Sequence, residues 1–431
     1  MYKNKITRLL RHLFTISFII LIASGCNQKL PDPKWNDSLS ISAENPKSTE
    51  SNIAIDIYID ATTSMEGFAI KEKSIYGQFL DQLEASALSA WKNADVKYYK
   101  FGERVKLINR QEFLAAKNNM KFYREKGIFK KTLIDSVIKT TDTNRLSVVI
   151  TDLFQDEGDV NIMVERIKER CFKKNVMVGI VGIKTEFDGW VYDTPNKPKG
   201  YKLKTDERPF YALIFGDTYK MERLFEALKA KEFVKENQIL FVSNYIMNSS
   251  KVSIVKTKDS KFINKISTRS QMENSFDFSM KEQGKEARFN YELTLDRNPR
   301  CIDFDENSIT LVVYKKSLTD PKNPNPDSVL TNDIKIENIK REGNSLKATL
   351  KLKNDDQKGN YSYLIFLQPN QISGFIMPEW VKEFSTDNPV VNTPSASQTY
   401  NLEKLVSRLI VGKNSVTPIY ISKSFINIYK R

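Results

Sequence analysis

The sequence predicts two domains: an α/β domain with a mainly parallel central sheet, followed by a smaller antiparallel β-sandwich. The first prediction depends on apolar runs at 53–59, 146–150, 176–183 and 210–215, which alternate with helical stretches. Continuous apolar runs are typical of strands that are buried on both faces of a sheet. The second prediction depends on a change of period after about residue 250, where apolar residues begin to alternate with polar ones.

Amphipathic helical stretches lie between the strands of the first domain. Two stripes of apolar side chains at helical spacing are Ile75, Phe79, Leu83 and Trp91, and Met163, Ile167 and Cys171. Residues 193–208 are polar and contain proline, and we expect a surface excursion there between two strands. The first domain therefore takes residues 51–245.

Alternating strands dominate the second domain, which takes residues 250–385. Two alternating runs are Phe289, Tyr291, Leu293 and Leu295, and Leu346, Ala348, Leu350 and Leu352. Further strands are expected at 308–314, 333–339 and 361–367, separated by turn signals rich in Asn, Pro and Gly. This pattern predicts a small sandwich of immunoglobulin-like type and leaves its strand order open. Residues 386–431 are expected to form a C-terminal tail with one helix and a short final strand.

The N-terminus has the parts of a secretory signal. A basic start is followed by an apolar stretch, 13–23, that is well short of the roughly 20 residues needed to span a bilayer. The run Ile22-Ala23-Ser24-Gly25-Cys26 resembles the bacterial lipobox. The resemblance implies that residues 1–25 are removed and that Cys26 is acylated. The protein is then anchored to the cell membrane or outer membrane on its extracytoplasmic side. A plain secretory signal that contains a cysteine is the alternative.

Residues 26–50 have the composition of a flexible tether. They are polar and contain Pro31, Pro33 and Pro46, which does not favour a packed core. We expect a chain that begins at Ser51 to fold with little loss of stability.

The composition excludes several classes of enzyme. The one histidine is His12, inside the signal, so the mature chain has no imidazole for a Ser-His-Asp or Cys-His centre or for a His-ligated zinc site. Cys171 and Cys301 are either two free thiols or a disulfide between the domains. The net charge of +14 is spread along the chain, which is typical of a solvated basic surface, and no nucleic-acid-binding module is present.

Oxygen-bearing side chains follow the first buried strand at every second position. They are Asp60, Thr62 and Ser64, a pattern that by itself is common among helix N-caps. Two further residues, Thr132 before a helix and Asp152 after the strand at 146–150, follow in an order that suits one site. Ligands in open α/β sheets bind at the carboxyl ends of strands, and hard cations prefer oxygen donors.

Together these five residues resemble the metal-ion-dependent adhesion site of von Willebrand factor type A (vWA) domains. The resemblance covers roughly residues 50–245 and implies a Rossmann-like vWA domain. It also implies a bound Mg²⁺ or Mn²⁺ with one coordination position open for a carboxylate of a partner protein. One departure is Leu153, where many members of the family have glycine. Another is the presence of Glu66, Asp156 and Glu157 near the metal loops, which would make the site more acidic.

These observations favour a non-enzymatic envelope lipoprotein that binds a partner protein through a divalent cation, with no catalytic residues. Two alternatives remain. One is a structural scaffold that the metal stabilises and whose binding does not depend on the metal. The other is a magnesium-dependent hydrolase, which lacks support because no phosphate-binding glycine loop is present. The cluster Pro378-Glu379-Trp380-Val381 is read as core or interdomain packing, with a contact patch as the alternative.

Overall fold

The computed structural model describes Trp35 and most of residues 52–430. The gaps are 72, 129, 142–143, 154–156, 175, 193–198, 233, 236–237, 243–249, 259, 261–262, 270–272, 282–285, 296–303, 319, 321–322, 324–325, 354–357, 371–376 and 415–419. The signal, Cys26 and Cys301 therefore lie outside the described residues. In the described part of the chain, no helix is long and apolar enough to cross a membrane.

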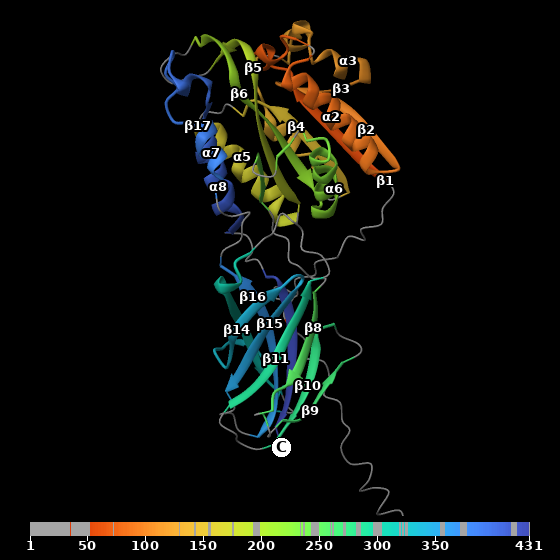
Figure 1. Cartoon of the computed structure of the whole chain (residues 1–431), viewed down its shortest axis with the longest axis vertical. Helices are drawn as coiled ribbons and strands as arrows, with labels where there is room; N and C mark the ends of the chain where they lie inside the picture. The colour runs from red at the N-terminus through yellow and green to blue at the C-terminus, as the bar shows by residue number, and fades with distance from the viewer. Residues whose placement is uncertain are drawn as a thin grey trace, which may run out of the picture.

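The first domain is built on a seven-stranded sheet with the order β3-β2-β1-β4-β6-β5-β7 (Figure 1). The strands are β1 (Asn52–Asp60), β2 (Asn93–Phe101), β3 (Val105–Ile108), β4 (Arg145–Thr151), β5 (Met177–Val191), β6 (Tyr201–Gly216) and β7 (Ile239–Val242). The apolar residues of β1 and β4 are buried on both faces, as the continuous apolar runs predict, so helices must cover this part of the sheet on both sides.

Two groups of helices cover the two faces of this sheet. The helices α2 (Ile75–Ala90) and α6 (Thr218–Lys229) bury their apolar stripes in one core, with Phe79 and Leu83 fully buried. On the other face, α5 (Glu157–Arg170) lies beside α8 (Leu402–Asn414) in a second core. The remaining helices of this domain are α3 (Arg110–Ala115), α4 (Ile134–Ile138) and α7 (Glu379–Phe384).

The prediction of a Rossmann-like vWA fold with a mainly parallel central sheet is wrong. Only the pairings of β1 with β2 and with β4 are parallel, and the other four pairings of this sheet are antiparallel. Over the described chain, strand residues outnumber helical ones. The reason lies in residues 184–209, whose described part holds no helix. Two parallel strands that follow one another in the chain need a crossover connection, which is usually a helix. The chain instead returns directly, so β5 and β6 form a long hairpin.

The second domain consists of two packed sheets with the orders β13-β12-β16-β19-β10-β9 and β14-β15-β11-β8. The rings of Phe278 and Phe289 meet edge to face between them, with centroids 5.1 Å apart. A wholly antiparallel, immunoglobulin-like sandwich is not what forms, because β10 and β19 pair in parallel. The strands are β8 (Ser250–Lys256), β9 (Ile263–Thr268), β10 (Ser275–Met280), β11 (Glu286–Leu295), β12 (Ile309–Ser317), β13 (Val329–Leu330), β14 (Ile334–Glu342), β15 (Ser345–Lys353), β16 (Gly359–Pro369) and β19 (Ser422–Lys430).

The C-terminal segment is divided between the two domains. It first returns to the first domain, where α7, β17 (Ser385–Thr386), β18 (Thr399–Tyr400) and α8 lie. Trp380 of α7 is 6% exposed and packs against Tyr211 of β6, so its cluster serves packing. The chain then enters the second domain as β19, which pairs with both β16 and β10.

Trp35, in the predicted tether, and Cys171, directly after α5, each contact an apolar core. Trp35 packs on the second domain with Leu364, Phe366, Tyr420 and Phe425. Cys171 is a buried free thiol, and burial raises its pKa to about 12, so it is a poor nucleophile.

Candidate metal centre

The candidate site lies where two neighbouring parallel strands end. Ile59 of β1 is level with Ile150 of β4, so Asp60 and Thr151 come next to each other at the same edge of the sheet. After Asp60 the chain turns into the 3-10 helix η1 (Thr63–Phe68). In Figure 1, α3 and the far end of β5 lie at the pole of the first domain that points away from the second domain. The parallel pairing thus brings the predicted residues to one place.

Four predicted residues form one hydrogen-bonded cluster around the carboxylate of Asp60. The hydroxyl of Thr62 donates to Oδ1 of Asp60 at 2.7 Å, and the hydroxyl of Thr132 donates to Oδ2 at 3.1 Å. The Oγ1 of Thr62 also lies 3.2 Å from Oγ of Ser64 and 3.1 Å from Oγ1 of Thr132. A fifth residue, which we did not predict, is Thr151, whose hydroxyl donates to Oδ2 of Asp60 at 2.8 Å. The sequence signal that could have identified Thr151 was its position directly before Asp152, a predicted ligand.

The cluster opens toward solvent on one side. Asp60 is fully buried and Thr62 is nearly so, whereas Ser64 and Thr132 are partly exposed. Burial, and after it the nearby charge of Asp152, raises the pKa of Asp60 to about 7. A buried carboxyl with exposed hydroxyls above it is a place where an added positive charge would be stabilised.

Asp152 has a different environment from the other four. It is 3% exposed, and its Oδ2 lies 3.7 Å from Nη2 of Arg208, whose residue is 1% exposed. Asp152 therefore faces a buried guanidinium that the sequence did not reveal. Arg208 lies in 193–208, which we predicted to be a surface excursion, and it belongs instead to the buried part of the β5–β6 hairpin.

The donors fit a hard divalent cation. All of them are oxygen, which suits Mg²⁺ or Mn²⁺. Neighbouring ligands of an octahedral Mg²⁺ at about 2.1 Å lie about 3 Å apart. The hydroxyl oxygens of Thr62, Ser64 and Thr132 have this spacing, at 3.1 and 3.2 Å. Among the described residues no group of three or more His, Cys, Asp or Glu side chains could hold a metal ion, so hydroxyls must supply most of the ligands.

Leu153, the residue that departs from the family pattern, has a strained backbone. Its φ of 50° lies in the left-handed region that glycine adopts most easily. Its side chain is 1% exposed and belongs to the second core of the domain. The backbone is thus left-handed here although the residue is a leucine, and burial of the side chain offsets the strain.

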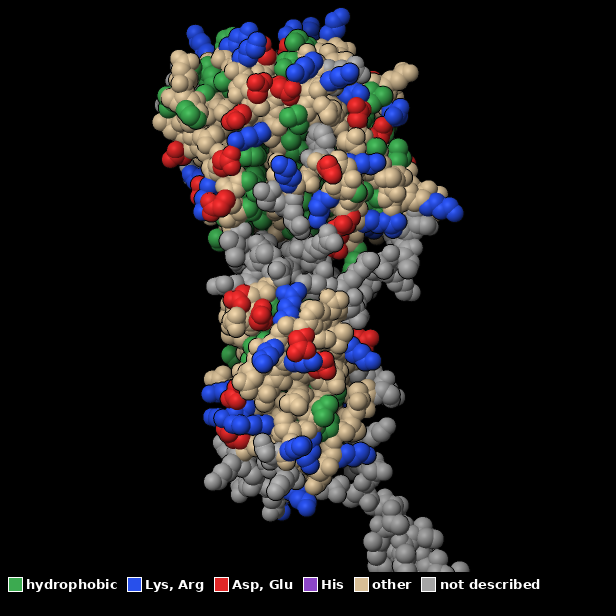
Figure 2. Space-filling model, viewed as in Figure 1, with side chains coloured by type: hydrophobic (Ala, Val, Ile, Leu, Met, Phe, Trp, Pro, Cys, Tyr) green, Lys and Arg blue, Asp and Glu red, His purple; other side chains and the backbone are tan. Residues whose placement is uncertain are grey.

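The rim of the site is basic. Glu66 forms an ion pair with Arg124, which neutralises its charge. Asp156 and the side chain of Glu157 lie outside the described residues. Lys130 and Lys131, directly before Thr132, are both exposed. Figure 2 shows Lys and Arg side chains along the end of the first domain remote from the second. For the described residues, then, the rim does not have the acidic character that we predicted.

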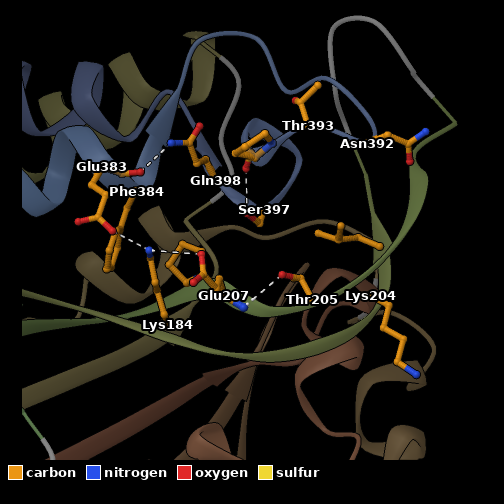
Figure 3. Close-up of a pocket in the computed structure, with 13 residues that line it drawn as sticks. Lys184, Lys204, Thr205, Glu207, Glu383, Phe384, Asn392, Thr393, Ser397 and Gln398 are labelled. Carbon is orange, nitrogen blue, oxygen red and sulfur yellow. Dashed lines mark hydrogen bonds and ion pairs between the residues drawn. The ribbon is translucent and has the colours of Figure 1, made fainter.

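A separate polar groove of about 590 Å³ lies between the β5–β6 hairpin and the C-terminal segment (Figure 3). At its floor Lys184 pairs with Glu383 at 2.6 Å and with Glu207 at 3.7 Å. The pair with Glu383 ties the segment to the hairpin, and the two glutamates together leave one net negative charge. None of the five predicted site residues lines the groove, so it is distinct from the candidate metal centre.

No protein-family model matches the sequence, and no curated protein is significantly similar to it. The resemblance to the adhesion site therefore depends on the five side chains alone.

Proposed function

We propose that this protein is an envelope lipoprotein, anchored through Cys26, that binds an anionic group of a partner protein through a divalent cation. The cation is held by Asp60, Thr62, Ser64 and Thr132, and the carboxylate of Asp152, the fifth predicted ligand, contributes its charge from its place beside Arg208. The proposal concerns these side chains only and does not depend on a parallel-sheet fold. It assigns no catalytic residue and no nucleic-acid partner.

One observation carries the proposal. The hydroxyl oxygen of Thr62 lies within 3.2 Å of two other hydroxyl oxygens, directly above the buried carboxylate of Asp60. Hydroxyls and a carboxylate grouped at this spacing give a cation several ligands at once. Because Ser64 and Thr132 are partly exposed, a further ligand has access from solvent.

The surroundings of the cluster favour an anionic protein partner. Lys130 and Lys131 are exposed and give the rim a positive charge, which attracts carboxylates and repels cationic surfaces. The end of β5 adds Trp190, which is 48% exposed and stacks on Tyr192 with ring centroids 6.3 Å apart. Exposed aromatic residues beside arginine are typical of the residues that contribute most to protein interfaces.

Calorimetry with Mn²⁺ and Mg²⁺ tests the metal site. The wild-type protein is expected to bind one ion, and Asp60→Ala and Thr62→Ala are expected to lose the binding without unfolding. Thr63→Ala is the matched control, since Thr63 makes no hydrogen bond to the cluster among the described residues. Equal isotherms for Thr62→Ala and Thr63→Ala, or no binding to the wild type, would refute the proposal.

Chelation separates partner binding from a structural role of the metal. If an acidic peptide surface binds through the cation, a chelator should abolish cross-linking to the partner while the circular dichroism spectrum stays unchanged. Cross-linking that survives chelation would favour a scaffold whose binding does not depend on the metal.

A further inference from the structure

Arg208 is the most deeply buried cation near the candidate site. It lies on β6, three residues before Tyr211, which pairs with Thr151 at the end of β4. This places Arg208 in the part of the β5–β6 hairpin that extends beyond the end of β4. Only 1% of its surface is exposed. Its Cζ lies 4.9 Å from the centroid of the Phe187 ring, so the guanidinium is stacked and held in place.

The hairpin that carries Arg208 is packed firmly against the metal loop. A Cβ on Gly189 would lie 2.7 Å from Cα of Gly67, so the backbones of β5 and η1 are in close contact. The ring of Phe187 also meets Phe68 of η1 edge to face, with centroids 4.8 Å apart. Because η1 begins with Thr63, the hairpin that carries Arg208 packs directly on the loop that follows Asp60.

The guanidinium of Arg208 and a bound divalent cation would both interact with the carboxylate of Asp152. Arginine remains protonated in proteins, and a buried arginine requires a nearby negative charge. Asp152 supplies that charge at 3.7 Å. Asp152 directly follows Thr151, whose hydroxyl donates to the carboxylate of Asp60. A divalent cation bound beside Asp60 would therefore lie near the carboxylate of Asp152 and would be repelled by the guanidinium.

We propose that Arg208 is a built-in cation that competes with the metal for Asp152 and thereby lowers the metal affinity of the site. This inference rests on the proposed function and deepens it. The positive charge that remains when both the metal and Arg208 are present is best compensated by an anion. Binding of the metal and binding of a partner carboxylate are consequently coupled, so that each strengthens the other.

The test is Mn²⁺ binding, followed by calorimetry and by the electron paramagnetic resonance signal of free Mn²⁺. Arg208→Met, which is neutral and of similar length, is expected to bind Mn²⁺ about ten-fold more tightly than the wild type, or tighter still. Arg208→Lys keeps the charge and should resemble the wild type. Arg124→Met is the matched control, because Arg124 is 62% exposed and solvent screens its charge.

The outcomes separate this inference from the proposed function. Tighter Mn²⁺ binding by Arg208→Met than by the wild type supports the inference. If the wild type binds Mn²⁺ too weakly to measure while Arg208→Met binds it, the proposed function is contradicted and the inference stands. Equal or weaker binding by Arg208→Met, with measurable binding by the wild type, overturns the inference and leaves the proposed function intact. If neither protein binds Mn²⁺, both fail.

Loss of folding in the variant is also informative. Arg208→Gln is a second neutral variant, which keeps a polar amide beside Asp152. If either variant folds only when Mn²⁺ is present, the metal has replaced the guanidinium as the counter-charge, as the competition requires. Failure of both variants to fold at any Mn²⁺ concentration would overturn the inference.

Discussion

The indole ring of Trp35 lies against the ring of Phe425, with centroids 6.3 Å apart, and this contact joins the N-terminal stretch to the second domain. The Nζ of Lys316 lies 5.3 Å from the centroid of the same indole. The stretch around Trp35 was predicted to be a flexible tether with no core to join. Since Phe425 belongs to β19, Trp35, which precedes β1 in the chain, packs on the second domain.

Removing Trp35 should therefore destabilise the protein, contrary to the expectation from sequence. A chain that begins at Ser51, and Trp35→Ala in the full mature chain, should each lose about 1–2 kcal/mol of the free energy of unfolding. Differential scanning calorimetry measures the effect. Trp190→Ala is the control, because Trp190 is 48% exposed and its loss should leave the melting temperature almost unchanged. Identical melting of the shortened and full chains would restore the tether interpretation.

The second prediction concerns pH in the metal-free protein. The pKa of Asp60 is raised to about 7 by burial and by Asp152, whereas an unfolded aspartate titrates near 3.9. Between these values the folded state binds more protons, so the stabilisation is fully present below about pH 4 and is lost as the pH rises through about 7.

Asp60→Asn, which cannot ionise, should remove this loss of stability. In the presence of a chelator its melting temperature should be nearest to that of the wild type at about pH 4 and should exceed it by a growing margin up to pH 8. Mg²⁺ at pH 8 should then raise the melting temperature of the wild type only. Parallel melting curves for the two proteins across this range would contradict the raised pKa.

The third prediction follows from the left-handed backbone of Leu153. Leu153→Ala removes a buried side chain and should cost about 2–5 kcal/mol of the free energy of unfolding. Leu153→Gly removes the same side chain but also relieves the backbone strain, which is about 1–2 kcal/mol. The glycine variant should therefore be the more stable of the two, in reverse of the usual order. Chemical denaturation measures both, and an alanine variant that is more stable than the glycine variant would contradict the prediction.

The fourth prediction concerns the lipid anchor. Cys26→Ser should abolish incorporation of labelled palmitate and release the protein from membranes washed with carbonate. Cys171→Ser is the control, because Cys171 is a buried free thiol of the first domain and its replacement should leave labelling unchanged. A Cys26→Ser protein that still carries the label would show that the lipobox resemblance is misleading.

Local sequence patterns are sufficient to predict the place of many elements. The strands at 53–59 and 146–150 were predicted from apolar runs, and the structure has them as β1 and β4. Because these two strands are parallel neighbours, their ends meet, and Thr62, Ser64 and Thr132 form hydrogen bonds in one cluster with Asp60. Local signals were sufficient here, since each donor lies within a few residues of a strand or helix end.

The direction of the later strands was decided only by the tertiary structure. A continuous apolar run indicates that a strand is buried on both faces. The run looks the same whether the neighbouring strands are parallel or antiparallel. The run at 210–215 was therefore placed correctly but given the wrong direction. In the described part of the connection between β5 and β6 there is no helix, which is a local sign of a hairpin.

Long-range packing also decided the roles of Arg208 and Trp35. A lone arginine in a polar stretch is ordinarily a solvated side chain, and a lone tryptophan among prolines has no periodic neighbours to indicate a core. Arg208 is buried because the β5–β6 hairpin folds over Asp152, and Trp35 finds its partners on strands about 280 to 390 residues away in the chain. Contacts between residues so far apart in the chain depend on the total apolar surface that the domains bury on folding. No local sequence pattern indicates that total.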